Sequence, residues 1–334
     1  LSDTVPPDTS ESKNYWKIYA EHLDVRRTDV TVHMPGDTLQ VQAYLGKATV
    51  DDGYFDLYKG LYRIRRLDCT GGRLNYDNNF ATRIRGVDYN HLSLSDITLG
   101  IDAFSYCKPR LSMYLRACTF KEKSGLKVEQ LAGTIMMDSL KLQLPSFILR
   151  TSESNIAVQL DMDLSAFDMA HPGKLNATVH ASVGKQDLIH FMQNLPPAFS
   201  RRFPNYPLRI DGVVRGNIQR VQLVGVCLKL PTAFSFKTDG YVANLTDMNH
   251  LCAELDVKAR TYDLSFVTSM LDREMMKTVH IPNGMSMDGH FKIDGSDYRA
   301  RFIVREGKGS VNGKVHINLR RMAYQARLSA DNLQ

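Results

Sequence analysis

The chain has 334 residues, of which 43% are hydrophobic and 23% charged, and its formal net charge is +6. This composition is typical of a folded protein and excludes a disordered one. The basic excess is small and spread along the chain without a recognisable nucleic-acid-binding module, so we expect no nucleic acid partner. No run of eighteen apolar residues occurs in the sequence, which excludes a membrane-spanning helix within it.

The chain begins with LSDTVPPDTSESKN, a polar stretch that contains two prolines. We expect residues 1–14 to be a flexible lead-in, and they do not have the pattern of a signal peptide. This beginning, and an end at ARLSADNLQ directly after a strand pattern, predict that the sequence is a piece of a longer protein. The five cysteines are widely spaced without a C-x-x-C pair, so we interpret them as small hydrophobic residues and leave the redox compartment open.

From Tyr15 onward, apolar and polar residues alternate over most of the chain. Such alternation predicts β-strands with one apolar and one polar face. The clearest alternating segments are 39–45, 97–103, 111–117, 140–144, 154–167, 175–181, 287–293, 311–319 and 322–328. Turn signals such as Asp52-Gly53 and Asp294-Gly295 separate these segments and predict an antiparallel meander of strands, most of them six to ten residues long.

Only two short segments have a helical pattern, DLIHFMQNL at 187–195 and DLSFVTSML at 263–271. Asp187 and Asp263 are good N-cap residues for them. The two aspartates lie 76 residues apart, and the Asp-Gly pairs at 211–212 and 288–289, each on a following strand, lie 77 residues apart. This spacing predicts a weak internal repeat of helix, loop and meander.

The fold class that follows is all-β: an elongated antiparallel sheet with two short helices, which the family resemblance given below implies to be curled into a groove. Sheets with repeated units grow by the addition of further units rather than by closing into a globule. We therefore expect a lead-in at 1–14, a first part of the groove at 15–185 and a second part at 186–334. The two repeat units of the second part are expected at about 187–262 and 263–334.

The sequence offers little catalytic chemistry. No two of its ten histidines lie within four residues of each other. Asp161 and Asp163 share a strand face, as paired acids must, but a solvent-facing strand carries such residues anyway. GKGSVNGK at 307–314 lacks the glycine spacing of a phosphate-binding loop and is better explained as a hairpin turn. We therefore expect no enzyme, no metal site and no cofactor.

Basic side chains recur along several predicted strands with a spacing close to two. They are Arg63, Arg65, Arg66, Arg83, Arg85, Arg299, Arg301 and Arg305. The simplest interpretation is that they cover solvated strand faces. Contact with anionic head groups or with an acidic partner is the alternative.

Two groups of segments resemble TamB-type proteins of Gram-negative bacteria, which belong to the AsmA-like superfamily. One group is FKEKSGLKVEQLAG (120–133) and LPSFILRTSESNIAVQLDMDL (144–164), with K-E-K-S-G-L and T-S-E-S-N-I as its most specific strings. The other is GVDYNHLSLSDITLGIDAF (86–104) and the later arrangement DLIHFMQNLPPAF…LRIDGVVRGNIQRVQL. The resemblance covers most of residues 15–330.

The resemblance implies a long periplasmic protein whose sheet curls into an apolar groove, often called a β-taco. It implies phospholipid transport from the inner towards the outer membrane, and outer-membrane protein assembly with an Omp85-type barrel partner. The family's N-terminal anchor and C-terminal conserved domain are absent from this sequence. We therefore expect an inner-membrane anchor elsewhere in the full-length protein. The family has no catalytic residues to transfer.

Within this frame, the apolar strand faces are expected to contact phospholipid acyl chains. The predicted lining residues are Ile97, Leu99, Ile101, Leu111, Met113, Leu115, Leu140, Leu142, Leu144, Ile156, Val158, Leu160, Met162 and Leu164. The plain alternative is that these side chains fill an ordinary dry β-core.

Other functions remain open at this stage. A periplasmic β-scaffold could assist outer-membrane protein insertion through its edge strands without carrying lipid. A secreted adhesin built as a β-solenoid is a third reading, but its repeats would be shorter than those seen here. An enzyme is the least favoured of these classes of function.

Overall fold

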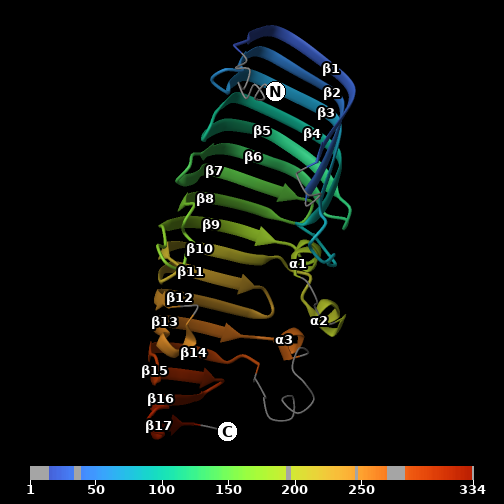
Figure 1. Cartoon of the computed structure of the whole chain (residues 1–334). Helices are drawn as coiled ribbons and strands as arrows, with labels where there is room; N and C mark the ends of the chain where they lie inside the picture. Colours follow the sequence, from blue (N-terminus) through green and yellow to red (C-terminus); the bar gives the residue numbers. More distant parts are fainter. Residues whose placement is uncertain (1–14, 34–38, 193–196, 245–246, 269–282, 333–334) are drawn as a thin grey trace, which may run out of the picture.

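The computed structural model describes residues 15–33, 39–192, 197–244, 247–268 and 283–332. The lead-in expected at 1–14 lies outside these residues. Seventeen strands make up most of the described chain (Figure 1). They are β1 (Lys17–His33), β2 (Leu39–Asp56), β3 (Leu61–Asn78), β4 (His91–Cys107), β5 (Arg110–Glu122), β6 (Lys127–Met137), β7 (Lys141–Thr151), β8 (Asn155–Asp163), β9 (Leu175–Val183), β10 (Leu208–Asn217), β11 (Arg220–Leu230), β12 (Phe234–Ala243), β13 (Cys252–Thr261), β14 (Ser286–Asp294), β15 (Asp297–Glu306), β16 (Gly309–Asn318) and β17 (Ala323–Asp331).

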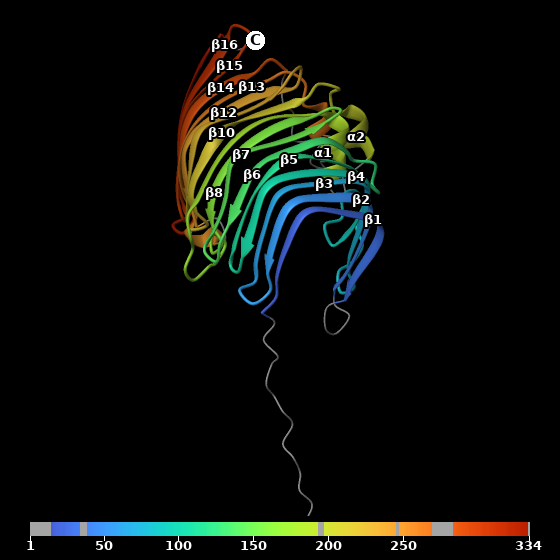
Figure 2. The same ribbon diagram turned by 90° about the horizontal axis from the view of Figure 1, so that it is seen from above.

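All seventeen strands belong to one antiparallel sheet in which each strand pairs with its neighbours in chain order. The first and last strands, β1 and β17, lie at opposite ends of the sheet and do not pair with each other (Figure 1). The sheet is therefore open. Seen along its length it bends into a U, most strongly at the N-terminal strands (Figure 2). The prediction of an elongated, curled, all-β sheet is confirmed.

The N-terminal strands are longer than the sequence pattern predicts. β1 to β4 have 17 or 18 residues each, whereas most strands were expected to have six to ten. The reason lies in irregular positions inside the strands, where Asp52, Asp96 and Ala103 have φ values of 51°, 54° and 52°. An irregularity of this kind shifts the alternation by one residue and bends the strand. One long curved strand therefore has the pattern of two short ones.

Some glycines inside the strands have a backbone conformation that other residues rarely adopt. Gly133 in β6 has φ +143°, and Gly240 in β12 has φ +139°. A Cβ on Gly240 would lie 2.0 Å from the carbonyl oxygen of Glu254 on the next strand. Only glycine allows both this conformation and this close approach.

The helices are short and lie along one long edge of the sheet (Figure 1). They are α1 (Lys185–Phe191), α2 (Pro197–Arg202) and α3 (Ser265–Thr268), while a 3-10 turn, η1 (Met248–His250), connects β12 to β13 at the opposite edge. The expected helix at 187–195 thus begins two residues earlier and ends by Phe191, while 193–195 lie outside the described residues. The expected helix at 263–271 is α3, with 269–271 likewise outside. The sequence pattern missed α2, because its six residues are too few to show a helical period.

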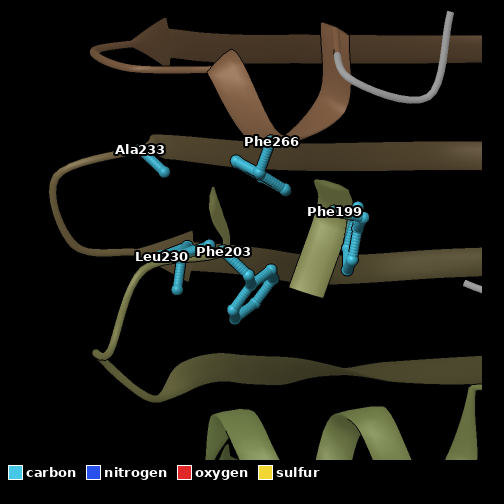
Figure 3. Packing of buried hydrophobic residues seen from close by; sticks show 5 residues of the cluster. All are labelled: Phe199, Phe203, Leu230, Ala233 and Phe266. Carbon is cyan, nitrogen blue, oxygen red and sulfur yellow. The ribbon is translucent and has the colours of Figure 1, made fainter. Parts of the chain in front are cut away.

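The buried core is concentrated under these helices. Phe199 of α2 and Phe203, directly after α2, meet Phe266 of α3, with ring centroids 5.2 to 5.5 Å apart (Figure 3). Leu230 and Ala233, where β11 leads into β12, complete the cluster and are fully buried. This cluster fixes α2 and α3 to the ends of the central strands.

The helices divide the second half of the strands into groups of four. α1 and α2 precede β10 to β13, and α3 precedes β14 to β17. The division into two parts at residue 185 stays a prediction, since a single sheet runs through the boundary. No helix among the described residues has the length and apolar character needed to cross a membrane.

Candidate functional site

One face of the sheet is apolar from the first strand to the last. Directly paired residues lie on the same face of a sheet, so the strand register can be followed from β1 to β17. One row of such pairs takes a single residue from every strand, and every member is apolar. The row is Val25, Ala48, Cys69, Leu99, Cys118, Leu131, Leu149, Ile156, Ala181, Ile210, Leu228, Phe236, Ala259, Met287, Val304, Val311 and Ala330. We call this face the inner face and the opposite one the outer face.

The predicted lining residues within strands all share the inner face. Ile101 pairs with Leu115, and Leu99 pairs with Cys118, the member of the row on β5. Leu142 and Leu144 of β7 pair with Met162 and Leu160 of β8. The remaining members of the predicted set follow from the same registers: Ile97, Leu111, Met113, Ile156 and Val158. Side chains from four strands, β4, β5, β7 and β8, therefore lie on one surface.

Two predicted lining residues lie at the border of this surface. Leu140 precedes β7 and is 71% exposed, and Leu164 follows β8 and is 47% exposed. The backbone N–H of Leu164 donates a hydrogen bond to the carbonyl of Leu140, so the two residues hold the ends of β7 and β8 together. They belong to the rim of the inner face and not to its floor.

The sequence pattern also missed lining residues. Phe147 and Leu149 on β7 pair with Val158 and Ile156 on the inner face. A register shift between Leu144 and Phe147 reverses the alternation along this strand. A search that restarted the alternation after Pro145 could have found both residues.

The inner face is only partly covered. Among the predicted lining residues, Ile101 and Leu115 are buried, with 8% and 5% exposure, while the others inside strands keep intermediate exposure. A second packed layer would bury such a face almost completely. Within the described chain, a second layer therefore does not cover the inner face, and the sheet that carries this face bends into a U (Figure 2). We call the inner face of this bent sheet the trough.

Helix α1 covers one edge of the trough. Phe191 at its end packs with a buried cluster of Val87, Leu126 and Val128. The carbonyl of His190 accepts a hydrogen bond from the Val87 N–H at 3.0 Å. Inner-face residues of neighbouring strands, such as Leu131 and Leu149, pack against the same cluster. Helix α1 therefore covers the trough along this part of the helical edge.

Asp187 fixes α1 in a way that the sequence pattern did not predict. It was expected to be the N-cap, but the N-cap is Gly184, which makes no side-chain capping bond. Asp187 lies in the first turn and is buried, and its carboxylate accepts hydrogen bonds from the hydroxyls of Thr151 and Ser154. These two hydroxyls belong to the turn between β7 and β8. The two buried hydroxyls therefore hold the Asp187 carboxylate by a tertiary contact, and this side chain does not cap the helix.

The outer face carries paired charges over the N-terminal strands. Arg116 Nη1 lies 3.1 Å from Asp102 Oδ1, and Arg116 also contacts Asp68. The carboxylate of Asp51 lies 2.7 Å from the ring of His22 and raises the pKa of that histidine. Such pairs keep the outer face hydrated and its charge locally balanced.

The other candidate motifs take structural roles. Lys141 Nζ lies 3.5 Å from Asp161 Oδ1 and 3.7 Å from Asp163 Oδ1. The two aspartates that share a strand face therefore form ion pairs with this lysine. GKGSVNGK runs from the hairpin turn into β16. Among the residues that the structure describes, no group of three or more His, Cys, Asp or Glu side chains is placed to hold a metal ion. The cysteines are free thiols.

Comparison with known proteins adds no relative to this description. No protein-family model, no curated protein and no solved structure matches the chain.

Proposed function

We propose that the trough conducts the acyl chains of phospholipids between two membranes, as the lipid-carrying part of a TamB-type protein of the periplasm. The observation that carries the proposal is the row of seventeen paired apolar residues, one from each strand of an open sheet. A large apolar surface that is left partly exposed marks a binding site for an apolar partner.

The energetics favour a lipid as that partner. Taking a two-chain phospholipid into water exposes about thirty methylenes at roughly 0.8 kcal/mol each, which amounts to more than about 20 kcal/mol. A carrier must offset most of this free energy along the whole path, without a single site that binds too tightly. A trough whose strands present similar Leu, Ile, Val and Met side chains meets both requirements, and methionine adapts to different chain shapes.

The resemblance of the sequence to TamB-type proteins supports the same function and adds its setting. In that setting the full-length protein is anchored in the inner membrane and works with an Omp85-type barrel in the outer membrane. The trough can hold an acyl chain without the membrane anchor and without the barrel protein, so lipid binding can be tested on this chain alone.

The test is a double substitution on the floor of the trough, Val158→Asp with Leu160→Asp. Two carboxylates beside the acyl chains would make the lipid-bound state unfavourable. We expect lipid to co-purify with the wild-type protein and to be lost from this variant, as measured by native mass spectrometry. Lipid at wild-type level in the variant would refute the proposal, as would its reproducible absence from the wild type.

The matched control is Ala157→Asp with Gln159→Asp. Both positions lie on the same strand, β8, but on the outer face, because they alternate with Val158 and Leu160. This control carries the same added charge and should keep the bound lipid. Circular dichroism of the β type in both variants would show that the sheet remains folded.

A scaffold for outer-membrane protein assembly is the second candidate, and the edge strands favour it. All nine residues of β17 are exposed, and among the described residues it pairs only with β16. A scaffold would use such a strand to bind a nascent protein. A scaffold would suppress the aggregation of an unfolded outer-membrane barrel protein equally well with and without Val158→Asp and Leu160→Asp. A lipid carrier predicts that these substitutions abolish lipid binding specifically.

A further inference from the structure

Three strands at the C-terminal end of the sheet carry a row of cations on the outer face. Arg301 of β15 pairs directly with Lys314 of β16, and Lys314 pairs directly with Arg327 of β17. Like charges placed directly opposite each other destabilise a sheet. The row is therefore a cost to folding unless an anion compensates it.

Asp239, Asp256 and Asp288 line the same side of the sheet, but among the described residues none of them forms an ion pair with this row. Neighbouring basic residues do have acidic partners: Arg299 Nε lies 2.8 Å from Asp297, and His316 Nε2 lies 2.7 Å from the other oxygen of the same carboxylate. Within the part of the chain that the structure describes, Arg301, Lys314 and Arg327 make no ion pair. The N-terminal strands differ, because Arg116 there is bound to two aspartates.

The three cations line a hollow in the outer face. This hollow has a volume of about 730 Å³, and its lining contains no acidic residue. We call it the basic depression, defined by the outward-facing residues Arg299, Arg301, Lys314, His316, Gln325 and Arg327. A second hollow of about 900 Å³ shares the three cations, extends towards β12 and is also lined by Asp239, Asp256 and Asp288, so the acid-free part of this surface is the first hollow.

We propose that the basic depression docks this part of the sheet on a membrane surface that carries anionic phospholipid. Neighbouring strands are about 4.8 Å apart, so the row presents three positive charges across about 10 Å. Phosphate groups of a lipid surface can meet all three at once, and each Lys or Arg near such a surface adds to the attraction.

The chemistry of the depression favours a lipid surface over an acidic protein. Protein interfaces have a core from which charged residues are depleted and in which aromatic or aliphatic side chains anchor the partner. All side chains that define the basic depression are polar or charged. Its apolar lining residues, Ala300, Val315 and Ala326, pair with one another and belong to the inner face. The proposal does not depend on what the trough carries.

The test is a triple substitution, Arg301→Gln, Lys314→Gln and Arg327→Gln, in the whole chain. Binding is measured by co-sedimentation with vesicles of phosphatidylcholine alone or mixed with phosphatidylglycerol. We expect the wild type to bind only the mixed vesicles, and the triple variant to bind them about a hundredfold more weakly. Added salt should weaken wild-type binding, since the contacts lie at the surface.

The matched control is Arg209→Gln, Arg215→Gln and Lys229→Gln. These residues are two arginines and one lysine, all exposed on the outer face of β10 and β11. The control should bind the mixed vesicles as the wild type does. Equal weakening in both variants would overturn the proposal in favour of diffuse net charge, and unchanged binding by the first variant would overturn it outright.

Two further measurements separate other sources of binding. Wild-type protein that binds inorganic phosphate or an acidic peptide, but no vesicles, would also overturn the proposal. The trough variant Val158→Asp with Leu160→Asp should still sediment with the mixed vesicles, because its basic depression is intact. Failure of lipid carriage and failure of membrane docking are therefore distinguishable.

Discussion

The hydroxyl of Ser154 donates a hydrogen bond to the carboxylate of Asp187, and both side chains are buried. The contact joins residues 33 positions apart, in the turn between β7 and β8 and in the first turn of α1. Ser154 also accepts a hydrogen bond from the Gly184 N–H at 2.9 Å, directly before the helix. One buried polar contact thus fixes the helix that closes part of the trough edge.

Removal of this carboxylate should loosen α1. Asp187→Ala leaves the hydroxyls of Thr151 and Ser154 without their acceptor, and we expect a loss of about 2–4 kcal/mol in the free energy of unfolding. Urea denaturation measures this loss, and amide exchange in 185–191 should accelerate. Gln186→Ala is the control, because Gln186 is exposed, and it should change stability by less than about 0.5 kcal/mol. Equal effects of the two substitutions would contradict the anchoring role.

The partial exposure of the trough predicts unequal costs for two similar substitutions. Leu115 is 5% exposed, whereas Leu160 on the same face is only partly buried. In lipid-free protein, Leu115→Asp should destabilise the fold by more than about 3 kcal/mol, and Leu160→Asp by about 1–2 kcal/mol. Urea midpoints of the two variants give the comparison. A dry core would make the two costs similar, and that result would remove the physical basis of the trough.

The sequence predicted the apolar face well but not the length or curvature of the strands. Alternation is a local property, and it identified Ile156 to Met162 as one side of a strand because β8 is regular. Ala103 was placed with Ile101 by the same rule, yet it has a left-handed backbone and interrupts the alternation on β4. An alanine gives no sequence signal for a left-handed backbone. The conformation accompanies the register shift between β4 and β5 at this position.

The trough lining and the basic depression also differ in how far the sequence predicts them. The lining residues could be predicted because the alternation within a single strand is enough to identify its apolar face. The basic depression could not be located, although Arg299, Arg301 and Arg305 were noticed as a basic series. Its decisive members Lys314 and Arg327 lie on other strands, and only the register places them opposite Arg301.

Asp297 should make stability depend on pH on the acid side. His316 donates a hydrogen bond to its carboxylate, and with smaller contributions from Asn318 and Arg299 this holds the pKa of Asp297 below its ordinary value of 3.8. A carboxylate with a lowered pKa in the folded state stabilises the fold above pH 3.8, and this contribution is lost as the pH falls through the folded pKa.

Asp297→Asn tests this dependence. The variant should be less stable than the wild type at pH 6, and the difference should vanish below the folded pKa, as measured by urea midpoints at several pH values. The carboxyl carbon signal of Asp297 in NMR should titrate below pH 3.8 in the wild type. A difference in stability that persists unchanged into acid would show that the carboxylate charge is not the cause.

Gly240 gives the sharpest test of how the sheet obtains its curvature. Its φ of +139° is accessible to glycine alone, and a Cβ there would lie 2.0 Å from the Glu254 carbonyl oxygen. Gly240→Ala must therefore either move β13 or break the ladder between β12 and β13. We expect a loss of about 3 kcal/mol or more in the free energy of unfolding.

Gly60→Ala is the matched control for that substitution. Gly60 also has a positive φ, +59°, but nothing lies within 4 Å of the position that a Cβ would take. Its cost should be about 1–2 kcal/mol, from the left-handed backbone alone. Because the excess cost at Gly240 comes from the neighbouring strand, lipid recovery should fall in Gly240→Ala and stay unchanged in Gly60→Ala. Equal costs, measured as urea midpoints, would show that close strand approach at Gly240 does not shape the trough.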